Sequence, residues 1–265
     1  MRYAICLANV GSYADPRVAS EIAVAAEESG WDALFVWDHL AFVWGPPATD
    51  PWITLAAVAT RTERIRIGTA VTPVARRRPQ VLAQQVATLD VLSRGRVIFG
   101  AGLGGSTSEF GKFGEPTDPH VRAEMLDEGL GLLRALWAGE EVQHRGVHYT
   151  VDGVTLAPTP VQERLPIWIG GNRAASLRRA SRWDGWIADS AAPRGTTLTP
   201  DDVAQSIATI GRRDDSFDVA VLAESDRGDP AAFARTGATW WLENLHDRRG
   251  DRSSMLSVVR AGPPA

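Results

Sequence analysis

The sequence contains a single cysteine and a single lysine among its 265 residues. Cys6 therefore has no partner for a disulfide bond within the chain, and its place in an apolar run favours a small buried side chain over a reactive thiol. No apolar stretch is long enough to span a bilayer, and Met1-Arg2 leads directly into a strand-like segment without a signal peptide. We therefore expect a cytoplasmic protein that does not enter the membrane.

A large excess of charge of one sign is also missing, because the formal net charge is −4. The basic residues are scattered apart from the run Arg76-Arg77-Arg78, which argues against nucleic-acid binding. Apolar residues make up 44% of the chain and charged residues 23%, values that allow a large buried core. We expect one domain over residues 1–265, a length typical of a (β/α)₈ barrel.

Short apolar runs alternate with longer segments of helical periodicity, as in βα units around a parallel sheet. Eight strands are predicted, at residues 3–8, 33–37, 65–71, 96–101, 166–170, 185–189, 217–223 and 238–242. The fold class is thus α/β, a single (β/α)₈ TIM barrel with insertions after strand 4 and before strand 5. Within the second insertion we predict a hairpin with its turn at Asp152-Gly153.

The active site of such a barrel lies at the carboxyl ends of its strands. The polar and glycine-rich candidates there are Asn9, Asp38, His39, residues 69–72, 102–109 and 170–172, Asp189, Glu224 and Glu243. Asp38 and His39 are the most suggestive pair, because an imidazole can donate or accept a proton near neutral pH. The alternative is a histidine that only holds a loop.

Two glycine-rich segments favour a cofactor. Gly170-Gly171-Asn172 precedes a predicted helix, so its backbone N–H groups can bind a phosphate, with Arg173 and Arg194 within sequence reach. The segment 100–104 lacks the rest of a dinucleotide-binding fingerprint and instead suits close approach of the backbone, Gly104 included, to a flat ring.

Other chemistries have little support. The five histidines are dispersed, so no metal site is expected. A Gly-x-Ser-x-Gly motif and a cysteine nucleophile are both missing, which disfavours covalent hydrolysis. Among the ten tryptophans, Trp44 in the loop after the second strand is the best candidate for a wall of a substrate site.

Several segments together resemble the luciferase-like monooxygenase superfamily. They are residues 27–39 (EESGWDALFVWDH), 62–73 (TERIRIGTAVTP), 79–90, 92–104 (LSRGRVIFGAGLG), 166–172 (PIWIGGN) and 182–186 (RWDGW). The resemblance runs over nearly the whole chain in the expected order. It implies an oxidoreductase, either a monooxygenase or a hydride-transfer enzyme, that acts on a small organic substrate.

The resemblance also implies a flavoprotein-like site for reduced FMN or the deazaflavin coenzyme F-420, bound without a covalent link. A cis peptide bond that does not involve proline is implied at Ala70-Val71, behind the ring. Residue by residue, His39 would approach the reactive face, Thr69, Ala70 and Val71 would back the ring, and residues 170–172 would hold the phosphate. A separate reductase supplying reduced cofactor and a homodimer are further expectations.

Two departures from the family pattern leave alternatives open, and the first is that lysine contacts to a phosphate are unavailable, which leaves arginine or the backbone. Gly105 stands where related deazaflavin-dependent sugar dehydrogenases carry a carboxylate, which keeps open a non-catalytic flavin-binding or carrier protein. Glu109 is the nearest carboxylate and is assigned to substrate binding. Arg76 to Arg78 either serve the longer tail of the deazaflavin or line a surface. A barrel isomerase that binds a phosphate at residues 170–171 is a third possibility.

Overall fold

The computed structural model describes residues 1–40, 45–189, 191–192, 195–196, 198–212 and 216–264. Eight parallel strands form a closed barrel in which β1 pairs with both β2 and β13, and β3 pairs with β5. Around the ring they are β1 (Arg2–Leu7), β2 (Ala33–Val36), β3 (Arg66–Thr69), β5 (Val97–Gly102), β8 (Ile167–Gly170), β9 (Gly185–Asp189), β12 (Asp218–Ala223) and β13 (Trp240–Leu245). The predicted (β/α)₈ barrel is confirmed.

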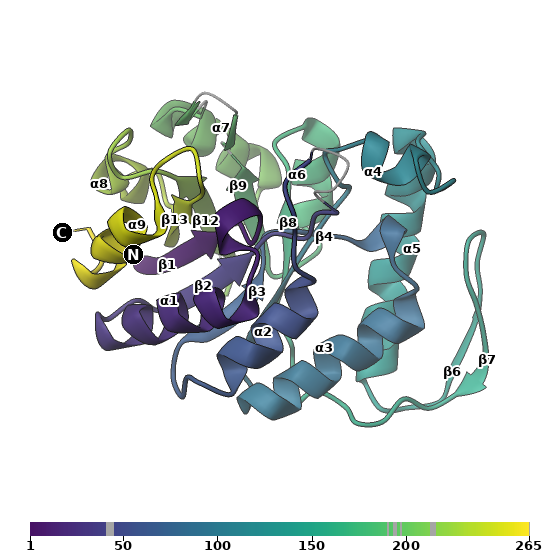
Figure 1. Ribbon diagram of the computed structural model, residues 1–265. Helices are drawn as coiled ribbons and strands as arrows, with labels where there is room; N and C mark the ends of the chain where they lie inside the picture. Colours follow the sequence, from purple (N-terminus) through teal and green to yellow (C-terminus); the bar gives the residue numbers. More distant parts are fainter. Residues whose placement is uncertain (41–44, 190, 193–194, 197, 213–215, 265) are drawn as a thin grey trace.

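Helices follow the strands and lie on the outside of the barrel (Figure 1). They are α1 (Pro16–Glu28), α2 (Pro51–Ala59), α3 (Pro79–Ser93), α4 (Ser108–Gly111), α5 (Pro119–Trp137), α6 (Ala174–Ala180), α7 (Pro200–Ile210), α8 (Pro230–Ala234) and α9 (Arg252–Arg260). Asp15, Asp50 and Asp118 cap α1, α2 and α5 ahead of a proline at the first helical position, which stabilises these starts. Within the described residues, no helix has the length and apolar character needed to cross a bilayer.

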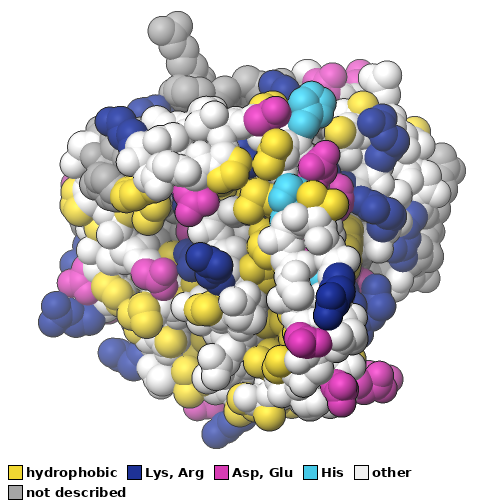
Figure 2. Space-filling view, turned by 90° about the vertical axis from the view of Figure 1, so that its right-hand side faces the viewer, with side chains coloured by type: hydrophobic (Ala, Val, Ile, Leu, Met, Phe, Trp, Pro, Cys, Tyr) yellow, Lys and Arg dark blue, Asp and Glu magenta, His cyan; other side chains and the backbone are white. Residues whose placement is uncertain are grey.

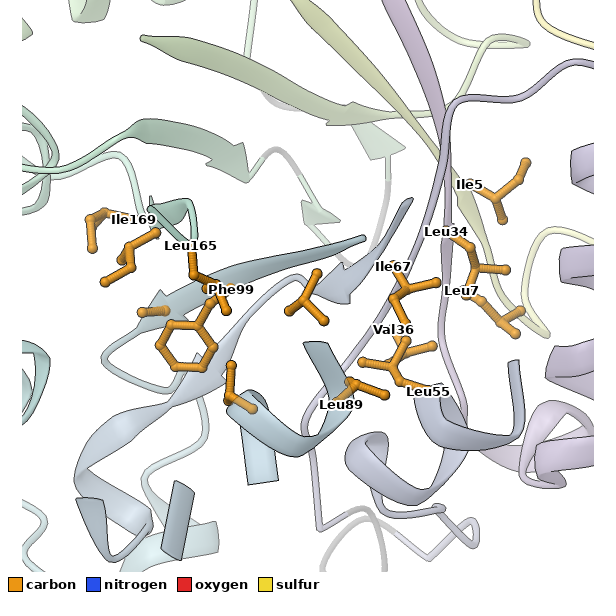
Figure 3. Packing of buried hydrophobic residues seen from close by; sticks show 14 of the residues in the cluster. Ile5, Leu7, Leu34, Val36, Leu55, Ile67, Leu89, Phe99, Leu165 and Ile169 are labelled. Atoms are coloured by element: carbon orange, nitrogen blue, oxygen red, sulfur yellow. The ribbon is translucent and has the colours of Figure 1, made fainter. Parts of the chain in front are cut away.

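Side chains of each strand alternate between two buried clusters, because successive residues of a strand face opposite sides. The outward cluster lies between strands and helices, where Leu55 of α2 and Leu89 of α3 approach Val36 and Ile67 (Figure 3). Burial of this layer holds the helices against the barrel.

The inward cluster fills the barrel with aromatic rings. Phe35 stacks on Trp168 with ring centroids 5.4 Å apart, and Trp168 meets the edge of Trp240 at the same distance. The interior is therefore a packed core, and a large cavity opens beyond the carboxyl ends of the strands.

The hairpin before β8 exists, but its predicted turn is wrong. Antiparallel strands β6 (Val142–Arg145) and β7 (Thr150–Val154) are joined by residues 146–149. Gln143 pairs with Asp152 and Val142 with Val154, so Gly153, at φ +65°, is an extra residue within β7. The Asp-Gly pair thus makes a β-bulge, which demands the same positive φ as a turn.

The hairpin extends away from the barrel beside α5 (Figure 1), where Glu128 accepts hydrogen bonds from the N–H groups of His148 and Tyr149. On the face that carries it, basic side chains are scattered among acidic and hydrophobic ones (Figure 2). This face offers no continuous basic patch.

Candidate active site

A cavity of about 1280 Å³ opens at the carboxyl ends of the barrel strands. Its walls include most of the residues that the sequence nominated: Asp38, His39, Ala70, Val71, Gly104, Gly170, Gly171 and Asn172. Trp44 and Arg194 lie outside the described residues. Residues predicted from strand-end position therefore lie together around one cavity.

One wall of the cavity is flat and apolar around Val71. A Cβ atom at Gly102 would lie 2.4 Å from Val71 Cγ2, and one at Gly170 would lie 2.8 Å from Val71 Cγ1. The Ala70-Val71 peptide bond is cis, at the position that the resemblance implied. Thr69 is fully buried behind this wall, where its hydroxyl donates to the Gly100 carbonyl oxygen at 2.9 Å. The glycines leave a surface against which a flat ring can lie.

His39 is held by a buried carboxylate. Its Nδ1 lies 3.0 Å from Glu109 Oε2, while Glu109 Oε1 accepts the Leu40 N–H at 2.6 Å and Oε2 accepts from Arg76 Nη1 at 2.9 Å. Burial alone would raise the pKa of the Glu109 carboxyl group, but the hydrogen bonds and charges of His39 and Arg76 lower it below the ordinary value. Glu109 is 1% exposed and its carboxylate contacts the His39 imidazole, while its assignment to substrate binding stays a prediction.

Asp38 is engaged by two arginines. Its Oδ1 accepts from Arg76 Nη2 at 2.7 Å, and Arg77 bonds both oxygens, from Nε at 2.9 Å and from Nη2 at 2.8 Å. At 2% exposure the carboxylate of Asp38 is bound by these two arginines, and a catalytic role for Asp38 stays a prediction. Arg76 and Arg77 are both hydrogen-bonded to the Asp38 carboxylate and are not available to bind a cofactor tail.

The glycine pair after β8 lies on the cavity wall together with Arg173 and Ser176. Gly171 has φ +112°, and a Cβ there would lie 2.9 Å from Ser176 Oγ. Asn172 is turned toward the barrel rim, since its Nδ2 donates to the Asp189 carbonyl oxygen at 2.5 Å. These residues form a small cradle with a hydroxyl and a guanidinium group beside the backbone.

Arg122 of α5 is a cavity residue that the sequence reasoning missed. Its side chain is 5% exposed, its guanidinium lies 4.5 Å from the Phe110 ring, and Nη1 donates to the Gly104 carbonyl oxygen at 3.1 Å. Among the described residues, Nε has no hydrogen-bond partner and no carboxylate forms an ion pair with the group. Burial lowers its pKa. A signal existed, because Arg122 begins the buried stripe that continues through Leu126 and Leu130.

The end of β13 was misplaced in the prediction, which affects two further residues. The strand runs to Leu245, so Glu243 lies within it and faces outward, where it accepts from Trp241 Nε1 at 2.6 Å. The cavity wall at this side is formed instead by Asn244 and His246, with Glu224 from the end of β12. Of these three, only Glu224 was among the strand-end candidates.

The sequence profile of the luciferase-like monooxygenase family matches residues 1–254. The chain belongs to this family. An F-420-dependent glucose-6-phosphate dehydrogenase of Nakamurella multipartita is 38% identical over 213 residues, 77% of this chain and 61% of that protein. A protein of the same name from Nocardia farcinica is 38% identical over 237 residues, 85% of this chain and 69% of that protein. This luciferase-like chain therefore spans less than two thirds of the first relative.

Solved structures agree on the fold. The monooxygenase RslO1 of Streptomyces bottropensis superposes with a TM-score of 0.72 at 26% identity, covering 84% of this chain and 71% of that one. An F-420-dependent secondary alcohol dehydrogenase superposes with a TM-score of 0.76 at 19% identity, covering 92% of each chain. The luciferase-like barrel is thus shared by proteins whose names refer to different reactions, so the reaction of this chain has to be argued from its own residues.

Proposed function

We propose that this luciferase-like protein is an oxidoreductase that binds FMN or coenzyme F-420 without a covalent link and acts on a small organic substrate. The observation that carries the proposal is Arg122, a buried guanidinium group on the cavity wall that forms no ion pair with a carboxylate of the described residues. A buried charge without a partner is costly, and an anionic ligand group would supply the partner. The phosphate present in both cofactors fits that requirement.

The rest of the cavity fits the same ligands. The flat wall of Ala70 and Val71 between Gly102 and Gly170 suits an isoalloxazine or deazaisoalloxazine ring. The cradle at Gly170-Gly171 and Ser176 adds neutral polar groups for the phosphate side. Names of relatives that refer to F-420-dependent dehydrogenases support this assignment.

The chemistry that either cofactor supplies when bound is transfer of a hydride equivalent. For its part, the chain offers His39 at the mouth. Because the Glu109 carboxylate accepts from Nδ1, the neutral imidazole carries its proton on that atom and keeps the lone pair on Nε2. His39 can therefore hold or accept a substrate proton at Nε2. The Trp37 ring packs against the His39 imidazole in an edge-to-face arrangement, with ring centroids 5.8 Å apart.

Replacing Arg122 tests the proposal. Titration with FMN, reduced FMN and coenzyme F-420, followed by tryptophan fluorescence, should show saturable binding of at least one of them. In Arg122→Gln we expect affinity to fall by roughly 10- to 100-fold, the usual effect of losing a hydrogen bond to a charged group. Arg134→Gln, on the same helix but paired with Asp184, is the matched control and should bind normally.

Failure of all three cofactors to bind would contradict the proposal. A carrier protein is the second candidate, favoured by Gly105, where a Cβ atom would meet only open space and no carboxylate reaches the site from this position. Repeated oxidation of reduced cofactor by oxygen or an organic acceptor, measured by absorbance, would exclude a carrier. Glucose 6-phosphate is the first substrate to test.

We also propose that a separate reductase supplies the reduced cofactor. The protein is further proposed to form a homodimer, to consist of one domain over residues 1–265 and to lie in the cytoplasm. Sedimentation velocity of the purified chain decides the oligomeric state, and limited proteolysis decides whether the chain behaves as one unit.

A further inference from the structure

The side of the cavity formed by β12 and β13 carries a polar group of its own. In the ring of eight strands, β12 stands opposite β3 and β13 stands opposite β5. The flat wall of Ala70 and Val71 follows β3, so the ends of β12 and β13 face it across the cavity. A molecule lying on a ring bound at the flat wall would meet these strand ends.

Strand periodicity directs three polar side chains there. Trp240 and Leu242 of β13 lie in the inward cluster, so Asn244 and His246 continue the same face two residues further each time. In β12, Leu222 belongs to the same cluster and Glu224 continues its face. All three polar residues line the cavity.

Glu224 orients the imidazole of His246. The Nε2 atom of His246 lies 2.9 Å from Glu224 Oε1, and Arg227 Nε lies 3.2 Å from Glu224 Oε2. Because a carboxylate only accepts hydrogen bonds, the neutral ring carries its proton on Nε2 and keeps a lone pair on Nδ1. His246 is 19% exposed and lines the cavity, where Nδ1 is the ring nitrogen that is not bonded to Glu224.

Asn244 provides an independent observation. It is 4% exposed, and its Oδ1 has no hydrogen-bond partner among the described residues. Buried polar atoms are nearly always paired, so an unpaired acceptor on a cavity wall indicates a ligand donor that completes it. Asn244 Oδ1 is the acceptor without a partner in the described part of the chain, and His246 Nδ1 is a second acceptor on the same wall.

We propose that Asn244 and His246, with Glu224 orienting the imidazole, form the substrate subsite and bind a hydroxyl group of the substrate, whose single proton is donated to one of the two acceptor atoms. The subsite rests on the proposed oxidoreductase function and names its substrate class, a small alcohol. Apolar side chains of Ile187 and Leu222 beside these residues suit the carbon skeleton of such a molecule. A ketone or ether, which has only acceptors, would leave both protein atoms unpaired.

The test uses cyclohexanol and glycerol as hydroxyl probes and cyclohexanone as the acceptor-only control. Binding is followed by the ¹⁵N resonances of labelled histidine, first in the protein alone and then after cofactor is added. We expect at least one hydroxyl probe to shift the Nδ1 resonance of His246, and cyclohexanone to shift it less.

Two variants address the atoms directly. His246→Phe and Asn244→Leu keep the approximate size of each side chain, and each should weaken binding of the hydroxyl probe about tenfold. His144→Phe is the matched control, because His144 forms an equivalent pair with Glu128, at 3.0 Å, on the hairpin away from the cavity. Circular dichroism shows whether each variant folds. If one variant does not fold, the other variant and the wild-type histidine resonances test the proposal.

The proposal is overturned if neither hydroxyl probe shifts His246, if cyclohexanone binds as tightly as cyclohexanol, or if a folded variant binds the probe like wild type. These outcomes are separate from failure of the proposed function. A protein that binds no cofactor but shows the His246 shift would retain the subsite and lose the oxidoreductase assignment.

Discussion

At the scale of residues, the cavity is built from charged groups that hold one another in place. Glu109 and Asp38 are almost fully buried, and both are bonded to Arg76. Such pairs are expensive to break, because removal of one member leaves a buried charge unpaired. The network therefore holds residues 38–40 in place and with them the orientation of His39.

Glu109→Gln tests this positioning role. The amide cannot act as the same anionic acceptor for Nδ1, so the proton of His39 should redistribute between its two nitrogens. We expect turnover to fall by about 100-fold, a usual contribution of an oriented general acid or base. The measurement is turnover of reduced cofactor together with the ¹⁵N resonances of His39.

A purely structural role for Glu109 would change stability while leaving the tautomer of His39 as it is in wild type. Glu128→Gln is the control, since it removes the equivalent carboxylate beside His144 on the hairpin. Cofactor affinity should be retained in both variants.

At the scale of elements, close approach between strands decides which glycines can be replaced. At Gly100 in β5, a Cβ atom would lie 1.8 Å from the Thr69 carbonyl oxygen of the neighbouring strand, whereas at Gly105 nothing lies within 4 Å. A backbone atom cannot move aside without shifting its strand. The two glycines of one sequence segment therefore have different physical roles.

Gly100→Ala should reduce the free energy of unfolding by about 1–3 kcal/mol or more, the usual cost of overpacking. Gly105→Ala should change it by no more than about 0.5 kcal/mol. Urea unfolding followed by tryptophan fluorescence measures both. Equal losses in the two variants would contradict the argument from strand contact.

Two predictions about individual elements were wrong, namely the turn of the hairpin and the end of β13. The Asp152-Gly153 pair predicts a turn because glycine favours positive φ, yet a β-bulge has the same requirement. Only pairing with β6 distinguishes the two. The predicted end of β13 was also too early, because Glu243 and Asn244 are polar residues inside a strand whose partners only the fold supplies.

At the scale of the whole molecule, carboxylates that accept several hydrogen bonds should make stability depend on acid. Burial alone would raise the pKa of the Glu27 carboxyl group, but hydrogen bonds from the backbone N–H groups of Ile65, Arg64 and Glu63 lower it from 4.5. The pKa of Glu109 is lowered in the same sense. As pH falls below 4.5, the unfolded chain takes up protons before the folded chain does, so stability is lost with falling pH.

Glu27→Gln provides the check. At pH 7 the variant should be less stable than wild type, because the charged acceptor is missing, and the difference should shrink toward pH 3 as wild-type Glu27 becomes protonated. Urea unfolding followed by circular dichroism at both pH values gives the two differences. A difference that stays constant would contradict the lowered pKa.

The sequence by itself determined the barrel, its family and the side of the barrel that holds the cavity. Hydrophobic periodicity and strand-end position are local properties, and they were sufficient to nominate His39, Val71 and Gly170. The tertiary structure alone decided which charged side chains remain available to bind a ligand. Asp38 and Glu109 form ion pairs with arginines from a different loop, whereas Arg122 of α5 forms no ion pair with a carboxylate of the described residues. Such pairing depends on distances between side chains, which chain order does not encode.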